Sequence, residues 1–146
     1  MYQRILIAVD GSDLSNHALQ EAIALAQNLH AALRIVHVVD EVTLNWEGEY
    51  ADMSAVQESF RESGQRILEK AQNIAREAGM EHEAKLLEIQ TFGHRISDLI
   101  VEEAKDWPAD LIVVGTHGRR GLHDVLLGSV SDGVVRRASV PVLLVR

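Results

Sequence analysis

Cysteine is missing from this 146-residue sequence, and proline and aromatic residues are scarce. The absence of cysteine excludes disulfide bridges, thiolate metal sites and cysteine nucleophiles, and it suits a reducing compartment. Aromatic residues make up only 4% of the chain, so Val, Ile, Leu and Ala must build the core. No apolar run approaches the ~18 residues of a membrane span, and the N-terminus shows no signal-peptide pattern. We therefore expect a cytoplasmic protein without a membrane contact.

Positive charge is also in short supply. The formal net charge is −8, which argues against general nucleic-acid binding. The charge is unevenly distributed, because residues 115–146 contain five arginines and two aspartates and so carry +3, whereas residues 1–114 carry −11. An anionic ligand therefore meets the least unfavourable field near the C-terminal part of the chain.

Short apolar runs alternate with amphipathic stretches along the chain. Five runs are typical of buried strands, and they span residues 5–9, 33–39, 84–89, 111–114 and 139–145. Helical patterns separate them, and these connections are long enough for parallel pairing. The length suits one domain. We therefore expect a single α/β domain over residues 1–146, built on a parallel sheet.

Local signals indicate where the helices begin and end. Ser12 or Asp13 is expected to cap the first helix, and Gly79 is expected to stop the long second helix. Gly64 lies inside that second helix, at a cost on the order of 1 kcal/mol relative to alanine. Pro141 lacks an N–H group and therefore fits the start of a strand or the edge of a sheet.

A glycine-rich stretch follows the fourth apolar run directly and leads into a helical pattern. Gly115, Gly118 and Gly128 allow close approach of the backbone to a ligand, and Ser129 and Ser131 add hydroxyl groups. A strand followed by a glycine loop and a helix start presents backbone N–H groups to an anion. We interpret this stretch as a grip for the phosphates of a nucleotide.

The turn Asp10-Gly11-Ser12 follows the first strand and is the second unusual loop. In open parallel sheets, ligands bind beyond the carboxyl ends of the strands where the chain order reverses. If that reversal separates the first and fourth strands, Asp10 faces the glycine loop across one site. There it can accept a hydrogen bond from a ribose hydroxyl or hold a metal ion on the phosphates.

Two common nucleotide fingerprints are absent from the sequence. It contains no Gly-x4-Gly-Lys-(Ser/Thr) motif and no Gly-x-Gly-x-x-Gly after the first strand, which argues against a P-loop NTPase and a dinucleotide site. His117, His123 and Asp124 are candidates for catalysis by position only, and we assign no catalytic residue. The other histidines lack metal-ligand spacing, and His37 is expected to pack in the sheet.

The glycine spacing Gly115-x2-Gly118-x9-Gly128-Ser129 resembles the ATP-binding motif of the universal stress protein family, Gly-x2-Gly-x9-Gly-(Ser/Thr). The resemblance extends over the full chain. Its further parts are Ile-Leu-Ile-Ala-Val-Asp-Gly-Ser at the start, Val36-His37-Val38, Ala-Asp110-Leu-Ile-Val-Val-Gly-Thr-His-Gly, and Ser-Val140-Pro-Val-Leu-Leu-Val at the end. Because the motif is intact, the chain resembles the ATP-binding branch of that family.

The resemblance implies a Rossmann-like α/β fold, similar to the adenine nucleotide alpha hydrolases. Its five-stranded parallel sheet has the order 3-2-1-4-5 and carries helices on both faces. It further implies a homodimer paired through the C-terminal strand, Val140–Val145. ATP is the implied ligand. A Mg or Mn ion bound to its phosphates would be the metal ion that Asp10 can hold from its place in the turn.

The resemblance also assigns positions to the nucleotide, and Val38 is implied to contact adenine through its backbone. The implied nucleotide-binding residues are Ala8, Val9, Asp10, Val38, Gly115, His117, Gly118, Arg119, Gly128, Ser129, Val130 and Ser131.

Three functions are compatible with these observations. The first is an ATP-binding, homodimeric stress-response or signalling module with at most slow hydrolysis. The second is a nucleotidyl- or phosphoryl-transferring enzyme on the same fold, with Ser129 or Ser131 as a site of autophosphorylation. The third is a scaffold that binds AMP or another nucleotide.

Overall fold

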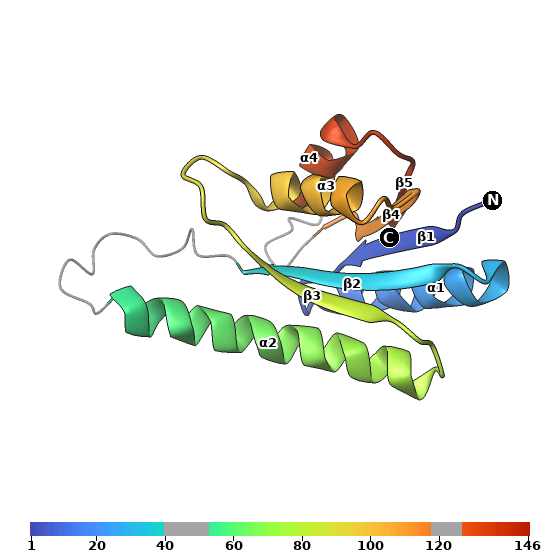
Figure 1. The fold of residues 1–146 in the computed structure, drawn as a ribbon, viewed down its shortest axis with the longest axis horizontal. Helices are drawn as coiled ribbons and strands as arrows, with labels where there is room; N and C mark the ends of the chain where they lie inside the picture. The colour runs from blue at the N-terminus through green and yellow to red at the C-terminus, as the bar shows by residue number, and fades with distance from the viewer. Residues whose placement is uncertain (40–52, 118–126) are drawn as a thin grey trace.

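A computed structural model of the chain describes residues 1–39, 53–117 and 127–146. Strands and helices alternate along these residues (Figure 1). The elements are β1 (Arg4–Ala8), α1 (Asp13–Leu29), β2 (Ala32–Val39), α2 (Met53–Glu77), β3 (Glu83–Glu88), α3 (Ile96–Asp106), β4 (Leu111–Gly115), α4 (Ser129–Arg137) and β5 (Val142–Val145).

The strands form one five-stranded sheet in the order β3-β2-β1-β4-β5. Every neighbouring pair is parallel, so the Rossmann-like fold and strand order that the sequence predicted are confirmed. The last strand is shorter than expected, because it begins at Val142. Pro141 precedes it, and its carbonyl accepts a hydrogen bond from Ile112 N at 3.0 Å.

Helices cover both faces of the sheet. In Figure 1, α2 lies below the sheet while α3 and α4 lie above it. Successive residues of a strand point to opposite faces, so Ile5 and Ile7 of β1 pack in the core between the sheet and the helices α1 and α2. Leu6, which stands between them in the strand, packs in a second core between the other face of the sheet and the helices α3 and α4. The central strands β1 and β4 are continuously apolar from Ile5 to Ala8 and from Leu111 to Val114, because both of their faces are covered.

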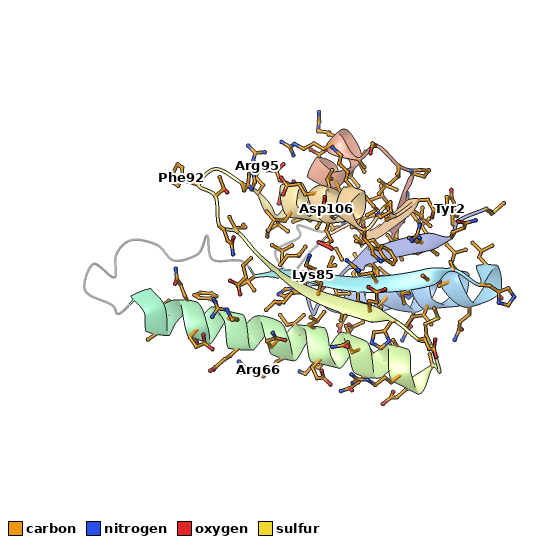
Figure 2. The ribbon with its side chains drawn as sticks, in the orientation of Figure 1. Tyr2, Arg66, Lys85, Phe92, Arg95 and Asp106 are labelled. Atoms are coloured by element: carbon orange, nitrogen blue, oxygen red, sulfur yellow. The ribbon has the colours of Figure 1, made fainter. Side chains whose placement is uncertain are left out.

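The predicted helix signals are found at the expected places. Ser12 caps α1, and its Oγ accepts a hydrogen bond from Ser15 N at 3.1 Å. Gly79 follows α2 with a φ of 70°, a conformation that favours glycine. Arg66 lies on the side of α2 that points away from the sheet (Figure 2).

Gly64 is explained by the packing of α2. A Cβ atom at this position would lie 3.0 Å from Val39 Cγ2, 3.2 Å from Leu86 Cδ1 and 3.3 Å from His37 Cδ2. These separations are tighter than ordinary contacts. Glycine therefore lets α2 approach the end of β2 closely, which offsets its poor helix propensity.

The two edges of the sheet differ in chemistry. Charged side chains lie along the β3 edge and are paired: Glu83 with Arg34, Lys85 with Glu103 at 2.9 Å, and Glu88 with an arginine of α2. Figure 2 shows Lys85 between β3 and α3. Charges on an edge strand discourage pairing with another sheet.

The opposite edge, β5, is apolar, and the side chain of Leu143 is 39% exposed there. Among the helices of the described residues, none combines the length and apolar character needed to cross a membrane.

Candidate functional site

A cavity of about 410 Å³ lies at the carboxyl edge of the sheet, where the chain order reverses between β1 and β4. Ten of the residues predicted from the sequence line it: Ala8, Val9, Asp10, Val38, Gly115, His117, Gly128, Ser129, Val130 and Ser131. Gly118 and Arg119 lie outside the described residues. The structure therefore brings the turn after β1 and the start of α4 to one site.

The turn after β1 is held by short-range hydrogen bonds. Asp10 Oδ1 accepts from Ser12 N at 2.9 Å, and Ser15 Oγ accepts from Asp10 N at 2.9 Å. Gly11 adopts a φ of 84°, which explains the glycine between them. Asp10 thus shapes the turn that places it on the cavity wall.

The start of α4 is fastened to the end of β4. Thr116 N donates to Val145 O at 2.9 Å, and Thr116 O accepts from Gly128 N at 2.7 Å. Ser131 Oγ lies 2.8 Å from the same Thr116 carbonyl and 3.1 Å from Gly128 O. Because its hydroxyl donates to a carbonyl and its side chain is buried, Ser131 anchors the helix start.

Gly128 is the N-cap residue of α4 and has no side chain with which to cap the helix. The first turn of a helix leaves N–H groups without partners inside the helix. Here these groups belong to Ser129 and Val130, both on the cavity wall. A helix start whose N-cap residue has no capping side chain, and which carries a partial positive charge, is suited to an anion.

Apolar residues of α2 and α3 complete the cavity, and the sequence had not indicated them. Phe60, Gly64 and Ile67 come from α2, while Ile96 and Ile100 come from α3. Their helical spacing is the ordinary signal of a core-facing helix, so nothing in it distinguishes a cavity wall from core. Gly64 inside a helix was the one available signal of a close approach.

An ion pair at the β3 edge holds the cavity end of α2. Arg61, next to Phe60, donates to Glu88 of β3 at 2.6 Å. This hydrogen bond and the charge of Arg61 hold the pKa of Glu88 below its usual value, although partial burial opposes the shift. The pair thus joins α2 to β3 beside the cavity.

Metal ligands do not gather in the part of the chain that the structure describes. Within residues 1–39, 53–117 and 127–146, no group of three or more His, Asp or Glu side chains could hold an ion. His117 lies on the cavity wall, and its Nδ1 is 3.1 Å from Thr116 Oγ1. The described lining of the cavity therefore offers backbone donors, hydroxyls, two imidazoles, one carboxylate and apolar walls.

The fold and the site together define an open parallel α/β protein with a cavity at the switch point of the sheet, which is where such sheets bind ligands. The family model described as the universal stress protein family matches residues 1–146. A universal stress protein of Methanocaldococcus jannaschii is 38% identical over 149 residues, which cover 100% of this chain and 83% of the relative. One of Bacillus subtilis is 36% identical over 154 residues, with 100% of both chains covered. The chain belongs to the universal stress protein family.

Solved structures of the family share the fold. A universal stress family protein from Burkholderia pseudomallei has a TM-score of 0.77 and 33% identity, covering 98% of this chain and 95% of its own. A universal stress protein in complex with cAMP has a TM-score of 0.69 and 29% identity, covering 99% and 97%. One from Archaeoglobus fulgidus in complex with dAMP has a TM-score of 0.68 and 28% identity, covering 99% and 98%.

Proposed function

We propose that the protein binds ATP in this cavity and acts as a homodimeric stress-response module of the ATP-binding branch of its family. The observation that carries the proposal is the lining of one cavity by the ends of β1, β2 and β4 and by the start of α4. Two structurally similar universal stress proteins are complexes with cAMP and dAMP, which supports an adenine nucleotide as the ligand.

The phosphates are assigned to the start of α4. Ser129 and Val130 offer first-turn N–H groups, and Gly128 contributes no side chain that would compete for them. Hydrogen bonds to a charged group are worth about 1.5–3 kcal/mol each, so a few of them hold a phosphate chain firmly. We assign Gly118 and Arg119 to the same phosphates from the sequence motif alone.

The base and ribose are assigned to the apolar part of the cavity. Ala8, Val38, Ile96 and Ile100 supply the walls, and the volume of about 410 Å³ lies in the range of about 300–1,000 Å³ typical of ligand pockets. Asp10 is the acceptor for a ribose hydroxyl. With phosphate oxygens as the other ligands, the same carboxylate fits an oxygen-preferring Mg or Mn ion.

Bound ATP would supply a transferable phosphoryl group, and the residues described here bind and orient it. We therefore propose holding of ATP with at most slow hydrolysis. If the protein autophosphorylates instead, Ser129 is the better acceptor, because it is exposed on the cavity wall while the Ser131 hydroxyl donates to a carbonyl. The monophosphates in the two similar complexes favour AMP as the alternative ligand.

The proposed homodimer pairs through the C-terminal strand. The β5 edge is apolar, and Leu143 is partly exposed on it. The β3 edge carries paired charges instead. An apolar edge that is not guarded by charge is the one suited to a second copy of the chain.

A matched pair of variants tests the phosphate site. Gly128→Asp and Gly128→Asn have side chains of nearly the same shape, and both residues are good N-caps. Only the aspartate places a negative charge at the start of α4. We expect both variants to fold, and we expect the aspartate variant to bind Mg-ATP at least about tenfold more weakly than the asparagine variant.

Isothermal titration calorimetry measures these affinities, with AMP as a second ligand. The absence of nucleotide binding by the wild-type protein, or equal affinities of the two variants, would contradict the proposal. Mass spectrometry of the ligand released from purified protein distinguishes ATP from AMP. Incubation with labelled ATP tests the enzymatic alternative, which predicts either stable labelling or steady turnover.

A further inference from the structure

The hydrogen-bond ladder between β1 and β2 ends in an unusual way. The last aligned pair is Ala8 and Val36, and Val9 N then donates to Val36 O at 2.9 Å. In a parallel ladder, the next bond runs from Val38 N to Val9 O. Among the described residues this bond is absent, and Val9 O lies 2.7 Å from His37 Nδ1 instead.

The same geometry fixes the direction of the Val38 backbone. The N–H and C=O groups of one residue point to the same neighbouring strand, and the direction alternates along the chain. Because Val36 O accepts from β1, the N–H and C=O of Val38 also point toward the β1 side. The strand β1 has ended there, and Val38 lines the cavity.

The side chain of His37 lies on the face of the sheet opposite to the side chain of Val38, and its imidazole is held in place there. His37 is 8% exposed. A Cβ atom added to Gly64 would lie 3.3 Å from His37 Cδ2, so α2 passes directly over the ring. A carbonyl oxygen accepts hydrogen bonds and cannot donate them. The contact with Val9 O therefore requires a proton on Nδ1, which fixes the orientation of the ring.

We propose that His37 is a positioning residue of the nucleotide site. Because its Nδ1 donates to the Val9 carbonyl, His37 prevents the hydrogen bond from Val38 N to Val9 O. The backbone N–H and C=O groups of Val38 therefore stay directed at the ligand. Such a pair is suited to a heteroaromatic base that presents a ring-nitrogen acceptor beside an amino donor. The inference rests on the proposed nucleotide binding, and it assigns a role to a buried histidine of the cavity wall through its contact with the Val9 carbonyl.

Two variants separate the hydrogen bond from the shape of the side chain. In His37→Asn, the amide N–H stands close to the position of Nδ1, whereas His37→Leu has a similar shape without a donor. We expect the leucine variant to bind ATP and AMP about tenfold more weakly, as for the loss of one hydrogen bond. The asparagine variant should stay within about threefold of the wild type.

Amide hydrogen exchange of Val38 gives a readout that does not depend on the ligand. In the leucine variant the Val9 carbonyl can accept from Val38 N, so exchange of this amide should slow by about tenfold or more. In the asparagine variant it should remain at the wild-type rate. A wild-type imidazole 15N spectrum should show a proton on Nδ1, which tests the role even if the leucine variant does not fold.

The outcomes are separable. If the wild-type protein binds no nucleotide, the proposed function fails, while the exchange and 15N measurements still test the arrangement at His37. If the wild type binds but both variants lose affinity equally, the ring shape matters and the donor does not, which overturns the inference. Unchanged affinity and unchanged Val38 exchange in the leucine variant overturn it as well, as does a proton on Nε2 alone.

Discussion

The contact of α4 with α3 at Gly133 provides a sharp test of the packing that supports the site. A Cβ atom added at this position would lie 2.3 Å from Ser97 Oγ and 2.7 Å from Ser97 Cβ. Ser97 is 3% exposed and belongs to the first turn of α3, so its side chain has little room to move. In Gly133→Ala the two helices must therefore separate.

Two opposing effects set the magnitude. Replacing glycine by alanine inside an open helix stabilises it by about 1 kcal/mol, whereas forcing extra atoms into a packed contact costs about 1–3 kcal/mol. The separation from Ser97 Oγ is far below a van der Waals contact, so the upper part of that range applies. We expect a net loss of about 2 kcal/mol, which for a domain of this size lowers Tm by about 6 °C.

Urea and thermal unfolding of Gly133→Ala, Ser97→Gly and the double variant measure the effect. Ser97→Gly removes the two nearest atoms that the new methyl group would meet and leaves Arg137 Nη1 at 3.2 Å, which is the end of a flexible side chain. Ser97→Gly should therefore lower the free energy of unfolding of the wild-type protein but raise that of Gly133→Ala. In a double-mutant cycle, the double variant should be more stable than the sum of the two single effects. A Gly133→Ala protein more stable than the wild type, or strict additivity of the two changes, would refute the reasoning.

Three further outcomes are expected. Leu143→Lys on β5 should turn the proposed dimer into a monomer in sedimentation velocity, while Lys85→Ala on β3 should leave it intact; a monomeric wild type would exclude this pairing. Ionised Glu88 stabilises the fold above its unfolded pKa, near 4.5, and that stabilisation disappears as pH falls through the lower folded pKa. Glu88→Gln should therefore lower the free energy of unfolding at neutral pH, and the variant should lose less stability than the wild type when the pH is lowered. Urea midpoints measured across this pH range test both effects; an unchanged pH profile would show that the Arg61 pair contributes nothing. Glu103→Gln should cost about 1–3 kcal/mol of unfolding free energy in urea, because Glu103 is buried and binds two basic residues; a neutral effect would contradict this.

Much of the fold could be predicted because its signals are local. The apolar strand runs, the Ser12 cap and the Gly79 stop depend on residues close in sequence, and each is found in the structure. The turn at Asp10 and the start of α4 could be placed at one site because parallel strands end at the same edge. That step needed only the strand order, which the family resemblance supplied.

The missed features depend on contacts between distant segments. The sequence analysis gave Glu103 of α3 no role, yet this carboxylate is 4% exposed and pairs with Arg34 of β2 and Lys85 of β3. The role of Gly64 depends on how closely α2 approaches β2. The hydrogen bond from the Ser131 hydroxyl to the Thr116 carbonyl joins residues 15 positions apart, and the sequence did not indicate it. Spacing along the sequence contains none of this information.

The contrast between the two sheet edges has a consequence for assembly. If two copies pair through β5 about a two-fold axis, both outer edges of the joined sheet are β3 strands. Each of these is bounded by the charges of Glu83 and Lys85, so neither recruits a third copy. In such a dimer, the charged β3 edges would prevent the continuous sheet from extending into a fibre.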